Sequence, residues 1–562
     1  MTRRQVFIGI LLTLVILSVH LSVMGDYGLT WDFHHIFFQG LRLVGRPITP
    51  DLTENIPFGQ PAPWDMYDVP FGQLMPMLSA WGYRLFHETL KVLPLDSGFH
   101  LTTVVIGSAG IFFLFLTLGE GFGFPVALTG LFILALYPRY FSEIQNNIKD
   151  VPQVTMFAVS MWLFWRFMNR RTVIMLFLSA AAFAVSFNIK INSVYIPVVA
   201  GLWVLTMLIT KSGRHLKQPL TLKPLRRLLP VAVYFPLAAF LALLVWIAFW
   251  DQPFRELLYI PRFFQENTRN LEVLLGGKWY CSTVSVPWYY PFYYLGIVTP
   301  LPVLVFFAIG TGYLLAWIRR KPMASLLLAW FLVPLLRFFL PKVAVIDGIR
   351  HFEEVIYPLC AISAVGAVSL YSSFISRIRR LPKLSRELPI YGLITGLPVI
   401  LFAVYLVYPV FRYHPYQLTY YNELVGGIRG ANTRYDLDYW GSSQKQAVRW
   451  LNRNAPPDAG VYIVMVPDVA AKYLRPDLLE HLNKVERDRS DYVVVLNRQS
   501  FFYRYFYTVE YMLTHDPVYT VETQGVPLVW IFDNKNPRAA FKTKWWTGES
   551  PCIRKYWISI PP

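Results

Sequence analysis

Long apolar segments divide the chain, and this pattern limits the folds that are open to it. Each segment has roughly the length of a helix that spans a bilayer, about 17–25 residues. Hydrophobic residues make up 55% of the 562-residue chain and charged residues only 15%, against about 25% charged in a typical soluble protein. We therefore predict an α-helical polytopic membrane protein with about eleven transmembrane helices. The predicted spans are 5–24, 100–118, 125–141, 152–168, 173–188, 194–210, 229–250, 295–316, 323–340, 354–375 and 389–411.

The basic residues predict the orientation of these spans. A net charge of +18 is typical of some nucleic-acid-binding proteins, but here the charge lies in short loops between apolar segments, the pattern that marks a cytoplasmic side. Segment 5–24 lacks a small-x-small cleavage site, so we expect a retained span rather than a signal peptide. We predict a multi-pass protein of the inner (plasma) membrane with a cytoplasmic N terminus and no nucleic-acid partner. The loops hold Arg3 and Arg4; Arg170 and Arg171; Lys211, Arg214, Lys217, Lys223, Arg226 and Arg227; Arg319, Arg320 and Lys321; and Arg377, Arg379, Arg380, Lys383 and Arg386.

Two domains are expected. Residues 1–411 form the transmembrane domain, with long outer loops at 25–99 and 251–294. The first loop contains semi-apolar stretches such as "FGQLMPMLSAWGYRLF", which predict helices lying in the membrane interface. Residues 412–562 alternate strand-like runs, "GVYIVMVPD" and "DYVVVLN", with a helical pattern, "SSQKQAVRWLNRN", that Ser442 or Ser443 can cap. They predict a small α/β domain, which lies outside the cell membrane (periplasmic or extracellular) after eleven crossings.

The three cysteines leave one question open. Cys360 falls in an apolar run and is expected in the core, whereas Cys281 and Cys552 both fall on the outer side. They could form a disulfide in an oxidising compartment, but sequence alone does not show whether they meet.

Two acids lie where predicted spans reach the outer face. Asp32 follows the first span in "GLTWDFHH", and Asp150 ends the loop "YPRYFSEIQNNIKDVPQ" just before a helix that begins near Pro152. Asp32 could be an ordinary solvated loop acid. Asp150 could simply complement the helix dipole. Either could also serve as a catalytic carboxylate.

Cations accompany these acids on the same side. Arg139 and Lys149 flank the second loop, as interface anchors or phosphate ligands, and Lys190 in "NIKIN" could either extend to the interface or bind an anion. The guanidinium of Arg350 in "DGIRHFEE" could bind the oxygens of a phosphate, or it could form an ion pair with a neighbouring acid. Together they favour transfer from a lipid phosphate: a carboxylate takes a proton from an acceptor, and cations hold the leaving phosphate.

Aromatic and histidine residues complete the candidate site. We predict that His34, His351 and Tyr289, the last in the run "PWYYPFYY", bind substrate. The acids could bind a divalent metal together with His34, His35 or His351, but their spacing is not diagnostic, so no metal or other cofactor is assigned.

The chain resembles the GT-C membrane glycosyltransferases, in the branch (glycosyltransferase families 39 and 83) that uses polyprenyl-phosphate sugars and includes protein O-mannosyltransferases and aminoarabinose transferases. The resemblance covers about residues 5–411. It is carried by "GLTWDFHH", "IKDVP", "NIKIN", "PWYYPFYYLGIVTPLP" and "RHFEEVIYPLCAISA". "YYNELVGGIRGANTRYDLDYWGSSQKQAVRWLN" is similar to a tail of bacterial members.

The resemblance implies a reaction and roles. A monosaccharide would pass from a polyprenyl-phosphate donor to a lipid, glycan or protein acceptor by single displacement, with inversion at the anomeric carbon. Asp32 matches the catalytic base and Asp150 a second acid, while Lys190 and Arg350 are expected on the lipid phosphate. The chain departs from many relatives at Phe33, where they carry another acid; this weakens any role for a metal.

Two other functions stay open. A flippase or transporter of lipid-linked sugars is one, although repeated halves typical of transporters are missing from the sequence. A non-catalytic membrane scaffold, whose tail binds a partner, is the other.

Overall fold

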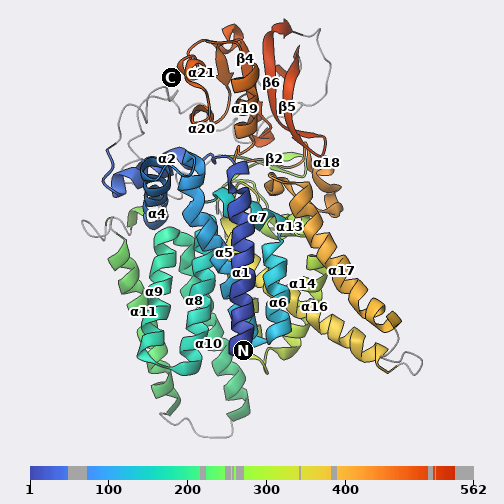
Figure 1. The fold of residues 1–562 in the computed structure, drawn as a ribbon. Coiled ribbons are helices and arrows are strands. Elements are labelled where there is room, and N and C mark those ends of the chain that lie inside the picture. Colours follow the sequence, from blue (N-terminus) through green and yellow to red (C-terminus); the bar gives the residue numbers. More distant parts are fainter. Residues whose placement is uncertain are drawn as a thin grey trace.

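The fold is described from a computed structural model of the full chain. It describes residues 1–47, 72–215, 223–246, 255, 258–260, 271–340, 343–380, 389–503, 505, 511–512 and 514–537. A bundle of long helices carries a smaller domain with a β-sheet at one end, and the N terminus lies at the opposite end of the bundle (Figure 1).

A helix occupies every apolar segment that the sequence predicts to span the membrane. Within the described residues, six of these helices are long and apolar enough to cross a bilayer, or seven if α6 (Phe124–Ala135) and α7 (Pro138–Asn146), which meet at a 64° bend, are taken as one span. The count of eleven spans therefore stays a prediction. The helices are α1 (Arg3–Val23), α5 (Leu95–Gly121), α6 (Phe124–Ala135), α7 (Pro138–Asn146), α8 (Asp150–Arg170), α9 (Val173–Ile189), α10 (Tyr195–His215), α11 (Lys223–Val245), α13 (Tyr290–Val298), α14 (Leu301–Trp317), α15 (Pro322–Leu336), α16 (Ile356–Ile378) and α17 (Pro389–Arg412).

The packing of the bundle separates inner from peripheral helices. Over their most apolar windows α5 and α16 are 61% and 67% buried, whereas the windows in α1 and α17 are 11% and 17% buried. Two glycines let α14 and α16 approach closely, because a Cβ at Gly310 or Gly366 would lie 2.0 Å from a carbonyl oxygen of the other helix. The inner helices therefore form a packed frame, and α1 and α17 present apolar side chains outward.

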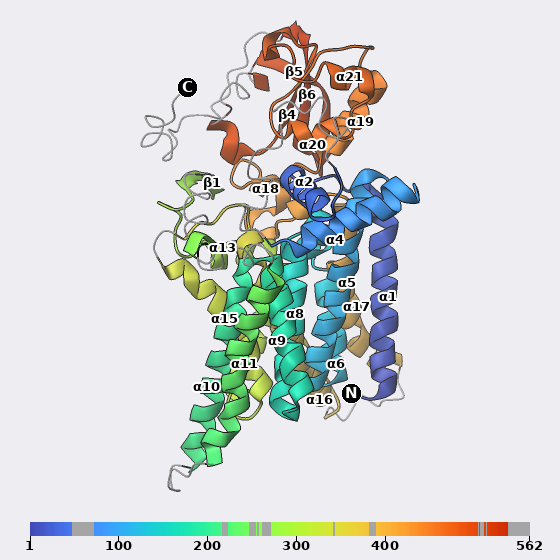
Figure 2. The ribbon, with the colours of Figure 1, turned by 90° about the vertical axis from the view of Figure 1, so that its left-hand side faces the viewer.

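Short helices lie between the bundle and the sheet, in the segment that the sequence predicts to be the first outer loop. They are α2 (Phe33–Leu43) and α4 (Leu74–Gly82) (Figure 2). One face of α2 is apolar: Phe33, Phe37 and Leu41 are buried, and Phe33 and Phe37 both contact Phe99 of α5. This packing fixes the start of α2, where Asp32 stands, against the end of the bundle.

The C-terminal domain is a mixed four-stranded sheet with short helices, as predicted. Its order is β3-β4-β6-β5; β3 runs parallel to β4, and the other pairs are antiparallel. The predicted boundary at 411/412 falls at the last residues of α17. The elements are α18 (Gly427–Ala431), α19 (Gln444–Asn454), β3 (Val461–Ile463), α20 (Pro467–Ala471), α21 (Pro476–Glu480), β4 (Tyr492–Leu496), β5 (His515–Thr523) and β6 (Val526–Pro537).

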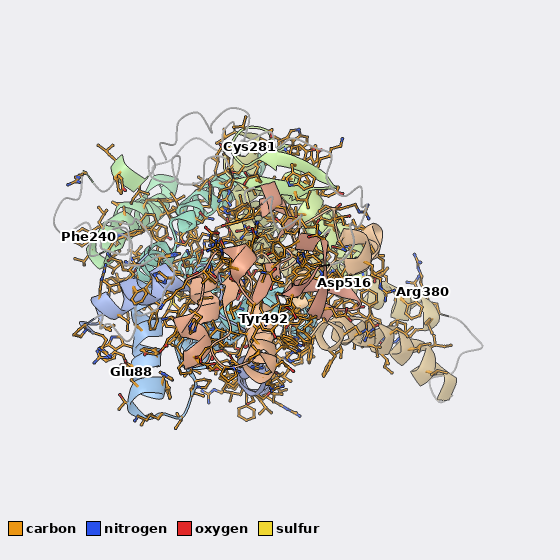
Figure 3. All side chains as sticks on the ribbon, turned by 90° about the horizontal axis from the view of Figure 1, so that it is seen from above. Glu88, Phe240, Cys281, Arg380, Tyr492 and Asp516 are labelled. Carbon is orange, nitrogen blue, oxygen red and sulfur yellow. The ribbon has the colours of Figure 1, made fainter. Side chains whose placement is uncertain are left out.

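The sheet domain lies above the helices rather than beside them. Viewed from above, Tyr492 of β4 projects onto the middle of the molecule, and Glu88, Phe240 and Arg380 project near its margin (Figure 3). α19 begins after Ser443, whose hydroxyl makes no capping hydrogen bond. The carboxylate of Asp438 instead accepts the backbone N–H groups of residues 441–443 at 2.8–3.3 Å.

The structure describes two of the three cysteines. Cys281 ends β2 (Lys278–Cys281), which pairs with β1 (Glu272–Leu275), and it is disulfide-bonded, whereas Cys360 is a buried free thiol. Cys552, with which the sequence analysis leaves a pairing open, lies outside the described residues.

Candidate active site

Arg350 stands between three carboxylates at the end of the bundle that carries the sheet domain. Its Nη2 contacts Asp32, its Nε lies 3.1 Å from Asp150 Oδ2, and its Nη1 lies 3.2 Å from Asp347 Oδ2. The Arg350 side chain is only 14% exposed, and its guanidinium carbon lies 4.3 Å from the centre of the Trp440 ring. One guanidinium therefore links the segment between α1 and α2, the start of α8 and the turn before η7 (Arg350–Val355) and α16.

A tight turn brings Arg350 to this position. Asp347 and Gly348 both have left-handed backbone, with φ of 56° and 63°, and the 3-10 helix η7 (Arg350–Val355) follows. Glycine is the residue that adopts this conformation at least cost. A Cβ at Gly348 would lie 3.2 Å from Arg139 Nη1, so a larger residue there would also crowd Arg139.

Asp32 occupies the N-cap position of α2 without capping it. An aspartate at this position ordinarily accepts a hydrogen bond from the first turn of its helix. The Asp32 side chain makes no such bond; its carboxylate instead contacts Arg350 and lies 2.9 Å from Lys149 Nζ. The side chain thus gives up a stabilising role in its own helix for contacts with two cations.

Asp150 is the first residue of α8 and is held by the turn before it. Asn147 Oδ1 accepts the backbone N–H of Asp150 at 3.0 Å, and Asn147 Nδ2 donates to Asp150 Oδ2 at 3.1 Å. Lys190 Nζ lies 2.5 Å from Asp150 Oδ1. With Arg350 on the other oxygen, the carboxylate, itself 1% exposed, is fully engaged.

The cations control the protonation of Asp32. Burial alone would raise the pKa of Asp32, but the positive charges of Arg350 and Lys149 outweigh burial and hold that pKa well below its usual range. Burial has the larger effect on Lys149 and lowers the pKa of its ammonium group. Asp32 is therefore a firmly ionised carboxylate while these partners remain in contact with it.

The C-terminal domain contributes residues that the sequence analysis did not identify. Arg498, in the segment after β4, lies 2.6 Å from Asp347 Oδ1, and Trp440 stacks under Arg350. Glu143 of α7 accepts hydrogen bonds from Tyr439 Oη at 2.7 Å and Trp440 Nε1 at 3.0 Å. The only sequence signal was the unusual density of acids and aromatic residues in "YDLDYW".

The other residues predicted for the site are Arg139, His34, His351 and Tyr289. Arg139 is fully buried, donates from Nε to the carbonyl of Tyr420 at 3.2 Å and lies over the Tyr421 ring, so it packs beneath the turn that carries Arg350. His34 lies 3.7 Å from Asp468 of α20, and burial lowers the pKa of its imidazole to about 4.

His351 and Tyr289 differ in their relation to the cluster. His351 follows Arg350 directly, and its carbonyl accepts a hydrogen bond from Asn192 Nδ2 at 3.1 Å. Tyr289 precedes α13, is 43% exposed and contacts the rings of Trp288 and Tyr293. The structure thus groups Asp32, Asp150, Lys149, Lys190 and Arg350, and substrate binding by Tyr289 stays a prediction.

The donor set of the cluster suits an anion better than a cation. The acids Asp32, Asp150 and Asp347 are each paired with at least one of Arg350, Lys149, Lys190 and Arg498. Within the described residues no group of three or more histidine, cysteine or acidic side chains is arranged to hold a metal ion. A phosphate oxygen could exchange for a carboxylate oxygen on these cations.

Part of the chain is similar to a known sequence family. The family model described as dolichyl-phosphate-mannose-protein mannosyltransferase matches residues 75–246, a stretch that includes Asp150 and Lys190. The match confirms the predicted resemblance to polyprenyl-phosphate-dependent membrane glycosyltransferases. No curated protein sequence matches the chain.

Solved structures with a similar arrangement have low sequence identity. ArnT from Cupriavidus metallidurans, in a structure bound to undecaprenyl phosphate, is 14% identical, with a TM-score of 0.48 over 98% of this chain and 100% of that one. The oligosaccharyltransferase of Archaeoglobus fulgidus in its apo form is 12% identical, with a TM-score of 0.45 over 86% of this chain and 69% of that one.

Proposed function

We propose that the chain is an inverting glycosyltransferase that moves a monosaccharide from a polyprenyl-phosphate donor to an acceptor hydroxyl or amine at the outer face of the membrane. One observation carries the proposal: Arg350, Lys149 and Lys190 gather around Asp32 and Asp150 at one end of an apolar helix bundle. The family match over residues 75–246 supports the same reaction class.

The donor phosphate would occupy the cations that now hold the acids. A guanidinium binds a phosphate with two parallel hydrogen bonds as readily as it binds a carboxylate. Phosphate on Arg350 and Lys149 would displace Asp32 from them, and Lys190 could add a further contact. Because these cations hold its pKa down, release from them would raise the pKa of Asp32 toward the range in which a carboxylate accepts a proton.

The chemical step would then use the released carboxylate. Asp32 accepts the proton that the acceptor group loses. The oxygen or nitrogen of the acceptor group forms a bond with the anomeric carbon, and the bond from that carbon to the phosphate oxygen breaks. The electron pair of that bond leaves with the polyprenyl phosphate, whose charge Arg350 and the lysines stabilise. Attack opposite the leaving phosphate inverts the anomeric centre. Asp150, held by Asn147 and Lys190, would keep the cations in place.

This mechanism needs no divalent metal. The cations of the side chains supply the charge that a metal ion would otherwise bring to the leaving phosphate. We propose that the reaction proceeds without a metal or other cofactor.

The orientation in the membrane follows from the same proposal. The N-terminal basic residues lie at the end of the bundle opposite the sheet domain (Figure 1), so the positive-inside rule assigns the sheet domain and the charged cluster to the outer face. A transporter would be expected to hold its substrate site near the bilayer midplane. The cluster at one end of the bundle favours the transferase over the flippase.

A binding experiment tests the proposed donor site. Undecaprenyl phosphate is titrated into the full-length protein in nanodiscs, with undecaprenol, which lacks the phosphate, as the matched control ligand. The proposal predicts saturable binding of the phosphate that weakens steeply in Arg350→Gln. Equal binding of the phosphate and the alcohol, or no change in the variant, would rule out a phosphate site at Arg350.

A further inference from the structure

Arg498 joins the C-terminal domain to the charged cluster, although nothing about its own surroundings in the sequence marks it as functional. Its side chain is 5% exposed, and its Nη2 lies 2.6 Å from Asp347 Oδ1. Burying an arginine is costly unless the charge is paired. The carboxylate that pairs with it belongs to the turn before Arg350, in the helical part of the molecule.

Asp347 divides its two oxygens between two arginines. Oδ1 accepts from Arg498 and Oδ2 accepts from Arg350 Nη1 at 3.2 Å. Asp347 is itself 5% exposed. The carboxylate is therefore a bridge, and a displacement of Arg498 would be transmitted to Arg350 through one side chain.

Packing around Arg498 fixes its guanidinium. Nη1 donates to the carbonyl of Tyr439 at 2.9 Å. The guanidinium carbon lies 4.7 Å from the centre of the Trp31 ring and 3.9 Å from that of Phe501. Trp31 directly precedes Asp32, and its backbone N–H donates to the carbonyl of Trp440 at 2.9 Å. Trp31, which precedes Asp32, and Asp347, in the turn before Arg350, thus both contact Arg498 of the C-terminal domain.

We propose that Arg498 is a positioning residue that sets the guanidinium of Arg350 for the donor phosphate. This inference rests on the proposed function, because it takes Arg350 as a phosphate ligand. With this role for Arg498, the C-terminal domain contributes to the donor site, whether or not it also binds the acceptor. In the absence of Arg498, Asp347 loses one of its two partners and turns wholly toward Arg350, which draws that guanidinium away from the phosphate.

The test separates positioning from simple folding. Arg498→Gln removes the charge, Arg498→Lys keeps it, and Asp347→Asn removes the bridge from the other end. Arg475→Gln is the matched control, because Arg475 makes a comparable set of bonds wholly within the C-terminal domain: Asp477 at 2.9 Å and the carbonyls of Asn452, Ala455 and Pro456 at 2.7 Å. The dissociation constant for undecaprenyl phosphate is measured for each full-length variant in nanodiscs, along with its melting temperature.

The proposal predicts a specific pattern of affinities. Arg498→Gln weakens binding about tenfold or more, as small displacements of a positioned group do, and Arg498→Lys recovers part of it. The double variant Arg498→Gln/Asp347→Asn weakens binding by less than the two single effects combined, because both substitutions remove the same ion pair. Arg475→Gln lowers the melting temperature but leaves the dissociation constant within about twofold.

Two outcomes would overturn the inference. If Arg498→Gln binds undecaprenyl phosphate as tightly as the unsubstituted protein while Arg350→Gln does not, the donor site stands and the positioning role is wrong. If Arg475→Gln weakens binding as much as Arg498→Gln, Arg498 acts only through the stability of its domain. Unchanged binding in Arg350→Gln itself would instead contradict the proposed function on which the inference rests.

Discussion

The guanidinium of Arg350 contacts the carboxylate of Asp32, although 318 positions separate the two residues in the chain. The expected phosphate ligand and the expected base thus form an ion pair with each other. A donor phosphate would compete with Asp32 for the same N–H groups. In this account, binding of the donor and activation of the base are a single event.

Arg350→Lys should impair the reaction nearly as strongly as Arg350→Gln. A lysine keeps the charge but cannot present three donor atoms to Asp32, Asp150 and Asp347 at once, or two to a phosphate. We expect a fall in kcat/KM of about a hundredfold, chiefly through the KM for the donor. Steady-state kinetics at varied donor concentration checks this. Arg429→Lys is a matched control, because Arg429 bonds the carbonyl of Gln524 on the exposed side of the C-terminal domain; retention of full activity in Arg350→Lys would contradict the account.

Lys149→Met should move the acid limb of the pH–rate profile upward. The charges of Arg350 and Lys149 lower the pKa of Asp32, so removing one of them raises that pKa. At low donor concentration kcat/KM reports the donor-free protein, and its acid limb should shift to higher pH in the variant. Lys278→Met, in the hairpin of β1 and β2, is the control and should leave the profile unchanged. An unshifted limb in Lys149→Met would show that Asp32 does not govern it.

The same shift affects stability. Because the pKa of Asp32 is lower in the folded chain than its ordinary value of about 4, its ion pairs stabilise the fold fully at pH values above that ordinary value. The contribution is lost as the pH falls from about 4 through the lowered pKa. The melting temperatures of the unsubstituted protein and of Asp32→Asn should therefore converge in acid and differ most at neutral pH.

Removal of divalent metal should leave sugar transfer unchanged. The acids of the site already face Arg350, Lys149, Lys190 and Arg498, so little negative charge is left for a metal ion. Transfer is measured after dialysis against a chelator and again after Mg²⁺ or Mn²⁺ is restored. Loss of transfer on chelation, with recovery on adding the metal, would contradict this prediction and show that transfer requires a metal ion.

Glu143→Gln should loosen the junction between α7 and the C-terminal domain. The two oxygens of Glu143 accept from Tyr439, Trp440 and Asn147, and an amide would turn one acceptor into a donor facing another donor. An unsatisfied buried group of this kind costs about 1–3 kcal/mol. Hydrogen exchange over residues 438–443 should increase. Glu423→Gln, where an exposed carboxylate accepts one bond from Tyr405, is the control, and equal exchange in both variants would contradict the role of Glu143.

Much of the site could be predicted from local sequence. Asp32, Asp150 and Lys190 stand where apolar runs end, and the alternation of basic loops places those ends on one side of the membrane. The structure brings them to a single cluster with Arg350. Helix periodicity and segment length likewise predict most of the bundle and the small sheet, because both depend on neighbouring residues.

The remainder depends on contacts between distant segments. Arg498 pairs with a carboxylate 151 positions away, and Tyr439 with one 296 positions away; neither pairing leaves a periodic pattern in the sequence. Tyr289 is predicted at the substrate; its ring is 43% exposed and contacts Trp288 and Tyr293, and its role in binding substrate stays a prediction. Arg139 is predicted on the phosphate; the structure buries it fully next to Gly348 of the 347–348 turn, and its contact with the phosphate stays a prediction.

The most direct test of the account is sugar transfer by Asp32→Asn compared with Asp26→Asn in proteoliposomes that contain a polyprenyl-phosphate monosaccharide and an acceptor fraction from the cell envelope. Asp26 is a carboxylate of the same loop that is 52% exposed and pairs with His414, which makes it a matched control. We predict that Asp32→Asn abolishes transfer and still binds undecaprenyl phosphate, whereas Asp26→Asn transfers at close to the unsubstituted rate. Undiminished transfer by Asp32→Asn would contradict the assignment of Asp32 as the base.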